Sequence, residues 1–204
     1  VDSFLDKFPT GGQVDVYPLM YKLAFEIVIR SLFNVKVPLE AQQHLSRFIR
    51  ETQEFVIKEV RQPHKSWWFN ISGEVRRNLK KAQDARGIIR NIIQERKKSN
   101  QKFNDLLDML LDARYEDNGA AMHEDQVIDE ILILLIAGHE TTANALAWTL
   151  FLLANHPLES KKLREATRDL TVNECVVHEQ LNAVIKESMR LYPPAWISDR
   201  VALA

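Results

Sequence analysis

The sequence predicts a mainly α fold in which a long central helix, at about residues 124–155, is packed by amphipathic helices. Two observations predict this fold class. The 204 residues include only 6 glycines and 7 prolines, whereas residues that favour helices, such as Leu, Glu, Lys, Arg and Gln, are abundant. Apolar residues recur at helical spacing over long stretches, while strand-like patterns are few, and the clearest of them is the tail after Pro194.

The composition indicates an ordinary globular protein with one core or two small ones. Hydrophobic residues make up 46% of the chain, charged residues 27%, and the net charge is −1. This balance gives no reason to expect nucleic acid as a partner. The single cysteine, Cys175, excludes an internal disulfide framework and suits a reducing compartment, so we expect cytoplasmic localisation. The sequence contains no run of about 18 uninterrupted apolar residues, so no membrane span is predicted.

The two ends of the chain are expected to be internal positions of a longer protein. The chain starts at Val1 without the basic start and apolar middle of a signal peptide. Its last residues, "SDRVALA", carry no feature typical of a natural end. A missing anchor or targeting segment therefore says little about the parent protein.

Periodicity and the residues typical of helix ends divide the chain into seven helical segments. Asp15 is expected to cap the first segment, where Leu23, Ile27 and Phe33 are candidate core residues. Residues 61–73 are expected to form a loop, because proline and glycine interrupt the pattern there. The expected segments lie at about residues 16–35, 39–60, 74–98, 103–119, 124–155, 157–170 and 178–191. The apolar stripe expected on the second segment consists of Leu45, Phe48, Ile49, Phe55, Val56 and Val60.

The third segment is strongly basic. Nine Lys or Arg and two Asp or Glu lie between Arg76 and Lys98. A basic helix can steer a partner or meet a membrane surface, but a solvated outer face is the favoured interpretation.

The middle of the central helix carries a run of small and polar residues, "AGHETT", at 137–142. The helical period places Ala137, Gly138 and Thr141 on one face, where small side chains let another group approach the backbone closely. The Thr141 hydroxyl can reach back to the Ala137 carbonyl, and Glu140 adds a carboxylate that is costly to bury unless it is paired, hydrated or used. The run therefore predicts a groove beside two proton-handling groups.

Ordinary structural roles are the alternative to this interpretation. Taken one at a time, Thr141 and Thr142 are more simply core threonines, and Gly138 is a point where helices cross; taken together, the run favours function. A zinc-protease motif is excluded, because its second histidine would have to occupy position 143, which is Ala143. His139 is interpreted as a structural neighbour rather than a metal ligand.

A second motif stands in the last helical segment, within "KESMRLYPP". Glu187 and Arg190 lie three residues apart on one helical face, which by itself predicts only a solvated ion pair. "AGHETT" resembles the oxygen-binding motif of the haem-thiolate monooxygenases, the cytochromes P-450, whose pattern is Ala/Gly-Gly-x-Asp/Glu-Thr-Thr/Ser. "ESMR" resembles the Glu-x-x-Arg motif of the same family. The two motifs in this order are a much more specific signal than either one alone.

The resemblance covers essentially the whole chain. It implies a truncated cytochrome P-450 fold, with residues 1–204 forming one partial domain from about helix D to just past helix K. It also implies that Thr141 holds the proton network beside bound oxygen, with Glu140 as the neighbouring acid in proton delivery. Glu187 and Arg190 would form a buried structural pair. The implied cofactor-binding residues are Ala137, Gly138 and Arg200, and the implied substrate-facing residues are Ile133, Ala195 and Trp196.

Members of this family bind the haem iron through a cysteine in a Phe-x-x-Gly-x-Arg-x-Cys-x-Gly loop, which does not occur in these 204 residues. Cys175 lacks the required neighbours and is interpreted as a plain thiol, so no metal ligand is assigned. We therefore expect the haem of the parent to be absent from, or weakly bound to, the isolated chain. We also expect this chain to be inactive alone and to self-associate through apolar faces left uncovered.

For the parent protein, the resemblance implies a monooxygenase that uses O₂, an apolar small-molecule substrate and electrons from a ferredoxin or flavin reductase. Two alternatives stay open. One is a family member with peroxygenase or rearrangement chemistry, against which the presence of both Thr141 and Glu140 argues. The other is a non-catalytic helical interaction protein whose polar cluster only satisfies itself within the core.

Overall fold

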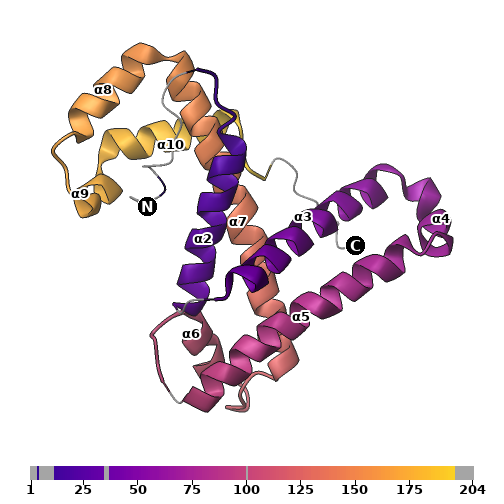
Figure 1. Cartoon of the computed structure of the whole chain (residues 1–204). Helices are drawn as coiled ribbons and strands as arrows, with labels where there is room; N and C mark the ends of the chain where they lie inside the picture. The colour runs from indigo at the N-terminus through magenta and orange to yellow at the C-terminus, as the bar shows by residue number, and fades with distance from the viewer. Residues whose placement is uncertain (1–3, 5–11, 35–36, 100, 196–204) are drawn as a thin grey trace, which may run out of the picture. The chain divides into compact units, whose positions relative to one another are not determined.

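The computed structural model describes residues 4, 12–34, 37–99 and 101–195, and most of these residues lie in helices (Figure 1). The only β-type pairing in the described part is an isolated antiparallel bridge between Arg114 and Ala121. The mainly α prediction is therefore confirmed. The helices are α2 (Tyr17–Phe33), α3 (Leu39–Arg61), η1 (Pro63–Lys65), α4 (Ser66–Ile71), α5 (Glu74–Ser99), α6 (Leu106–Asp112), α7 (Glu124–Asn155), α8 (Pro157–Thr167), α9 (Val172–Val177) and α10 (Glu179–Leu191).

The chain divides into two compact units. One consists of residues 1–26 and 137–204, and the other of residues 27–136. Both boundaries fall inside helices, since α2 continues past residue 26 and α7 begins before residue 137. Each unit has its own buried residues and is described separately.

In the unit 27–136, α3 and α5 pack against each other, and η1 and α4 connect their ends (Figure 1). The predicted stripe on α3 is confirmed at Leu45, Phe48 and Ile49, which are all buried. It is wrong at Val56 and Val60, which are 49% and 74% exposed. The period identifies the buried face in the first half of α3, but Val56 and Val60 near the end of the helix remain largely uncovered.

The expected loop at residues 61–73 is instead largely helical. Pro63 begins the short helix η1, because its fixed φ suits a first helical position and its missing N–H is not needed there. Phe69 anchors α4: its side chain is 1% exposed, and its ring packs against that of Phe55 at a centroid distance of 6.0 Å. The neighbouring Trp67 and Trp68 stay 62% and 52% exposed.

A buried ion cluster lies at the end of α5. Arg96 donates hydrogen bonds to both carboxylate oxygens of Asp105, at 2.9 and 2.7 Å, to Asp108 at 2.5 Å and to the Phe33 carbonyl at 2.7 Å. Asp105 also caps α6 by accepting from the Asp108 amide. The Arg96 guanidinium lies 4.4 Å from the centre of the Phe103 ring. This cluster therefore ties three segments together: the end of α2, the end of α5 and the start of α6.

Part of the basic face of α5 is paired rather than simply solvated. Arg86 bonds to Asp125 and Asp129 of α7, and Arg90 bonds to Asp125 at 2.8 Å. The hydrogen bonds from Arg86 and Arg90 lower the pKa of Asp125. Lys97 extends the series to Glu124 of α7 at 2.8 Å. The three cations stay partly exposed, so these are surface ion pairs on a solvated face of the helix.

In the unit that contains residues 1–26 and 137–204, α2 and α7 meet through small side chains. Met20 and Ala24 of α2 form a buried cluster with Ala143 and Ala147 of α7. Alanine at three of these four positions lets the two helix backbones come close together. The candidate core residue Ile27 lies elsewhere on α2 and is 43% exposed, whereas Phe33 is fully buried as predicted.

Helix α7 begins at Glu124 and ends at Asn155, as predicted. It is less covered than expected, because only 28% of its most apolar 18-residue window is buried. With a mean hydropathy of 1.3 over that window, α7 is the one described helix that is long and apolar enough to cross a membrane. Length and composition alone do not separate a membrane span from the core helix of a soluble protein. Exposed apolar residues of α7 include Ile133, Leu134, Trp148, Leu150 and Phe151.

Candidate functional site

The "AGHETT" run lies inside α7 and is helical throughout. The Thr141 hydroxyl donates a 2.6 Å hydrogen bond to the Ala137 carbonyl, which confirms the local contact predicted from the sequence. Ala137 and Thr141 are both exposed, and Gly138 is half-buried. These three residues therefore form an open strip of small side chains in which a hydroxyl is held back against the helix backbone.

The opposite side of α7 is closed. His139 and Ala143 have no exposed surface. A helix advances by about 100° per residue, so His139 points about 160° away from both Ala137 and Thr141. The run thus places its packed residues and its open residues on nearly opposite faces of one helix.

Glu140 is half-buried and lies between these two faces. Burial raises the pKa of Tyr17, and the negative charge of Glu140 raises it further. This electrostatic interaction indicates that the Glu140 carboxylate is near the start of α2. The carboxylate is therefore within reach of α2 as well as next in sequence to Thr141.

The His139 ring is enclosed by aromatic side chains of α2. Its centroid lies 3.9 Å from that of Tyr21 and 5.3 Å from that of Phe25, with interplanar angles of 73° and 77°. The Tyr17 ring lies 5.9 Å from that of Tyr21, tilted by 51°. This contact was not predicted from the sequence. The available signal was the four-residue spacing of the aromatic residues at positions 17, 21 and 25, which places them on one face of a helix.

Neither ring nitrogen of His139 has a hydrogen-bond partner. Burial lowers its pKa from 6.5 to about 4, and the nearby Tyr21 backbone opposes this shift only in part. The buried imidazole is therefore neutral at physiological pH.

The Glu187–Arg190 pair forms on α10. Arg190 donates to the two carboxylate oxygens of Glu187 at 2.7 and 2.6 Å, and these hydrogen bonds lower the pKa of Glu187. The side chains are 56% and 66% exposed, however, so the burial expected from the resemblance is not found in this chain.

The remaining predicted site residues are more scattered. Ile133 precedes Ala137 by one helical turn and is 57% exposed. Ala195 is exposed at the end of the described chain, while Trp196 and Arg200 lie outside the described residues. The structure thus brings together the residues of the α7 run and, separately, the two residues of the α10 pair.

Two further features of α7 and α10 were not found from the sequence. Trp148 of α7 stacks face to face on Tyr192, the residue that follows α10, with centroids 4.0 Å apart and an interplanar angle of 3°. A groove of about 440 Å³ also lies along α7, α8 and α10. Its lining includes Leu152, Leu153, Val184 and Glu187.

The open strip on α7 fits one face of a flat cofactor such as haem. Its residues are small, and no bulky side chain projects from positions 137, 138 or 141. The iron ligand has no counterpart here: Cys175 is half-buried in α9, and the described residues contain no cluster of three or more His, Cys, Asp or Glu that could hold a metal ion. The described residues therefore include an open strip of small side chains but no cluster that could ligate the iron.

Comparison with known proteins agrees with the motifs. The family model described as Cytochrome P450 matches residues 1–203. Cyclooctat-9-en-7-ol 5-monooxygenase from Streptomyces melanosporofaciens is 28% identical over 95% of this chain and 44% of its own length. A self-sufficient cytochrome P450 monooxygenase from Aspergillus niger, CYP505E5, is 39% identical over 59% of this chain and 12% of its own length.

Solved structures show the same fold. The haem domain of a cytochrome P450DA mutant matches with a TM-score of 0.78 and 21% identity, over 93% of this chain and 44% of the solved chain. Retinoic acid-bound cyanobacterial CYP120A1 matches with a TM-score of 0.75 and 23% identity, over 95% of this chain and 43% of the solved chain. The chain thus spans less than half the length of the proteins that it matches over most of its own residues.

Proposed function

The chain belongs to the cytochrome P450 family, and on this premise we propose that it forms the oxygen-side part of a haem monooxygenase. The complete protein would activate O₂ and insert one oxygen atom into an apolar organic substrate. The single observation that carries the proposal is the open strip on α7, where the Thr141 hydroxyl is held on the Ala137 carbonyl at 2.6 Å beside Glu140.

When bound, thiolate-ligated haem supplies electron density that favours O–O bond cleavage. The chain's own residues would do three things beside it. Ala137 and Gly138 leave space next to the helix backbone, since neither has a large side chain. Thr141 holds a hydroxyl at a fixed position, because its bond to the Ala137 carbonyl selects one rotamer. Glu140 supplies a carboxylate that exchanges protons with solvent.

Thr141 donates its own proton to Ala137, so its oxygen has free lone pairs facing the strip. It can therefore accept a hydrogen bond from a water molecule and hold that water near the cofactor face. Glu140 lies one residue away and is partly exposed, which lets it collect protons from solvent. Positioned proton transfer of this type typically contributes about 10²–10⁴-fold to a rate.

Two assignments extend this proposal. Arg200 would contact a haem propionate, and Ile133, Ala195 and Trp196 would face the substrate. The electrons would come from a ferredoxin or flavin reductase, either separate or fused. The Aspergillus niger relative CYP505E5 is described as a self-sufficient monooxygenase. A reductase fused to the same chain is therefore one of the arrangements to examine. We place the protein in the cytoplasm.

The isolated chain is proposed to be inactive, because its only cysteine lies in α9, outside any haem-ligand motif. Reconstitution of the 204-residue chain with haem should give no thiolate-type carbon monoxide difference spectrum. Detection of that spectrum would overturn this part of the proposal. NAD(P)H-dependent turnover by the complete protein separates a monooxygenase from a peroxygenase, a rearrangement enzyme or a non-catalytic interaction protein.

The decisive variant is Thr141→Ala in the complete protein. We expect product formed per NAD(P)H consumed to fall by about tenfold or more, with the electrons recovered as hydrogen peroxide, because the positioned hydroxyl is lost. Thr141→Ser keeps the hydroxyl and should restore most of the coupling. Thr142→Ala is the matched control, since it removes a neighbouring exposed threonine without touching the Ala137 contact. Unchanged coupling in Thr141→Ala would contradict the role of Thr141.

A further inference from the structure

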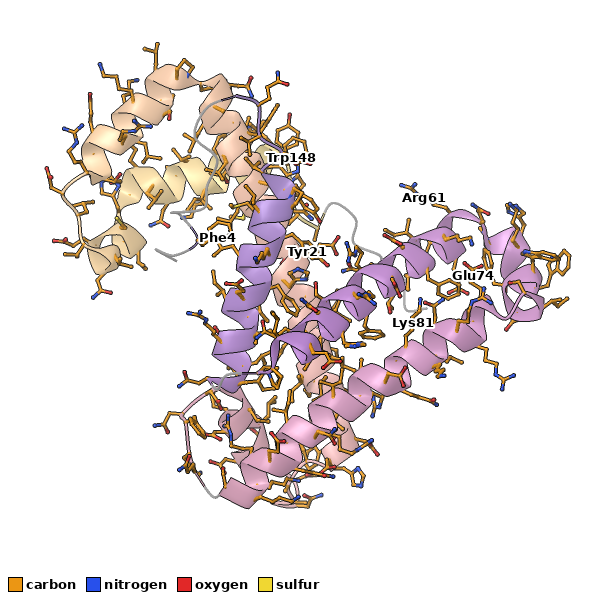
Figure 2. All side chains as sticks on the ribbon, in the orientation of Figure 1. Phe4, Tyr21, Arg61, Glu74, Lys81 and Trp148 are labelled. Atoms are coloured by element: carbon orange, nitrogen blue, oxygen red, sulfur yellow. The ribbon has the colours of Figure 1, made fainter. Side chains whose placement is uncertain are left out.

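The contact between α2 and α7 lies on the opposite side of α7 from the open strip. Tyr17, Tyr21 and Phe25 follow one another at four-residue spacing on α2, and the His139 ring of α7 lies against the last two of them. Tyr21 is labelled on α2 in Figure 2. We call these four side chains the aromatic seam.

We propose that His139 is a positioning residue: its ring, held by Tyr21 and Phe25, fixes the rotation of α7 about its axis and so fixes the direction of Ala137 and Thr141. This inference rests on the proposed function, since it concerns the direction in which the proton-handling strip faces. His139 is not itself assigned any contact with substrate or cofactor.

The helix needs such a contact because its other contacts with α2 are weakly specific. Ala143 and Ala147 are small and meet Met20 and Ala24, and partly buried aliphatic side chains such as Leu19 and Leu146 pack at the edge of this cluster. Alanine side chains let two helices approach, but a flat seam of methyl groups resists sliding and rotation only slightly. A planar ring enclosed edge-on by two other rings permits far fewer orientations.

Rotation of α7 would matter directly for the strip. His139 lies about 160° from both Ala137 and Thr141 around the helix, so a rotation of α7 about its axis moves all three residues through the same angle. Positioned catalytic groups lose much of their effect when they are displaced by about 1 Å. The buried ring and the open strip are therefore mechanically linked through one rigid turn of helix.

The imidazole performs this role through its shape rather than its polarity. Neither ring nitrogen has a partner at normal hydrogen-bond geometry, the Tyr21 backbone offsets only part of the effect of burial on the pKa of the ring, and the residue has no exposed surface. A phenyl ring should therefore replace it well, whereas a small side chain or a non-aromatic polar one should not. His139→Phe is therefore the conservative variant, and it is expected to keep the behaviour of the unchanged chain.

The test is hydrogen exchange of the 204-residue chain, followed by mass spectrometry of the peptide that covers residues 134–142. His139→Ala should speed exchange in this peptide by about tenfold or more, because the turn loses its anchor. His139→Phe should retain the slow exchange, and His139→Asn should resemble His139→Ala. The matched control is Leu163→Ala, which removes a buried side chain of α8 in the same unit and is compared at equal global stability in urea.

Equal exchange in residues 134–142 for His139→Ala and Leu163→Ala would overturn the proposal, as would full retention of slow exchange in His139→Asn. In the complete haem-loaded protein, His139→Ala should lower the product formed per NAD(P)H, and His139→Phe should restore it. The exchange measurement needs neither haem nor turnover. It can therefore succeed even if the monooxygenase proposal fails, and a failure of the seam leaves the Thr141 test unaffected.

Discussion

Arg96 and Asp105 form a doubly hydrogen-bonded ion pair that is almost completely enclosed by protein. Their side chains are only 4% and 2% exposed, and the guanidinium meets both carboxylate oxygens within 2.9 Å. Burial alone would raise the pKa of the neighbouring Asp108, but hydrogen bonds from the Phe103 amide, Arg96 and the Asn104 amide outweigh it and lower that pKa. The cluster therefore depends on the arginine charge being present.

Arg96→Met should destabilise the chain by about 3–5 kcal/mol, because it leaves Asp105 and Asp108 buried without a cation. Urea unfolding measures this free energy. The variant should regain part of its stability as the pH falls and its carboxylates become protonated, whereas the unchanged chain should lose stability as the pH falls through the lowered pKa of Asp108. Adding Asp105→Asn to Arg96→Met should recover stability at neutral pH.

Lys102→Met provides the matched control for Arg96→Met. Lys102 pairs with Asp112 outside the core, where the two side chains are 66% and 58% exposed. Exposed pairs of this kind contribute about 0–1 kcal/mol. Equal losses in Lys102→Met and Arg96→Met would contradict the assignment of the Arg96 cluster as a buried anchor.

The neutral state of His139 predicts a specific dependence of stability on pH. Burial lowers its pKa in the folded chain from 6.5 to about 4. The unfolded chain therefore binds a proton between these values that the folded chain does not, so the free energy of unfolding falls as the pH decreases from about 6.5 to about 4. The difference of about 2.5 pKa units corresponds to at most about 3 kcal/mol.

His139→Phe isolates this contribution because it keeps an aromatic ring and removes the titrating group. Its free energy of unfolding should change less between pH 6.5 and 4 than that of the unchanged chain. Other titratable groups lie near the seam. The charge of Glu140 raises the pKa of Tyr17 at the start of α2, and Lys22 and Glu26 directly follow Tyr21 and Phe25 in sequence. Parallel curves for the two proteins would show that His139 is not the source of the slope.

Contacts within one or two helical turns could be predicted from the sequence. Thr141 reaches the Ala137 carbonyl because residues four apart always lie next to each other along a helix. The ends of α7 were also predictable, since Glu124 suits the positive end of the helix dipole and Pro157 cannot continue the preceding helix. These features depend on local geometry alone.

Contacts between distant segments could not be predicted in this way. Arg96 bonds to the carbonyl of Phe33, 63 residues away, and nothing in the local pattern distinguishes Arg96 from the other cations of α5. The exposed Val60 shows the related limit of periodicity: a period identifies the face of a helix but not where along it the partner ends. The spacing of Glu187 and Arg190 predicted a solvated pair, as found in this chain, whereas the resemblance implied a buried one, because a motif does not say what covers it.

The exposed Glu187–Arg190 pair predicts a small effect in this chain. Glu187→Gln should leave the midpoint of thermal unfolding of the 204-residue chain almost unchanged, because both partners remain hydrated. In the complete protein the same change should reduce the yield of folded, haem-loaded protein, if further chain covers the pair there as the family motif implies. A large loss already present in the 204-residue chain would contradict the exposed geometry.

The uncovered apolar residues of α7 and α10 predict self-association of the chain. Phe151 of α7 and Leu191 of α10 are 48% and 47% exposed, and clustered apolar side chains of this kind favour a second protein surface over water. Sedimentation equilibrium should show a dimer or larger species that dissociates on dilution. Phe151→Gln combined with Leu191→Gln should shift the equilibrium towards monomer by about tenfold or more, since each side chain removed from water contributes about 1.5–3 kcal/mol.

Leu158→Gln is the matched control, because Leu158 is 75% exposed on α8, outside both helices. A monomer that persists at all concentrations, or an equal shift with Leu158→Gln, would show that α7 and α10 do not drive association.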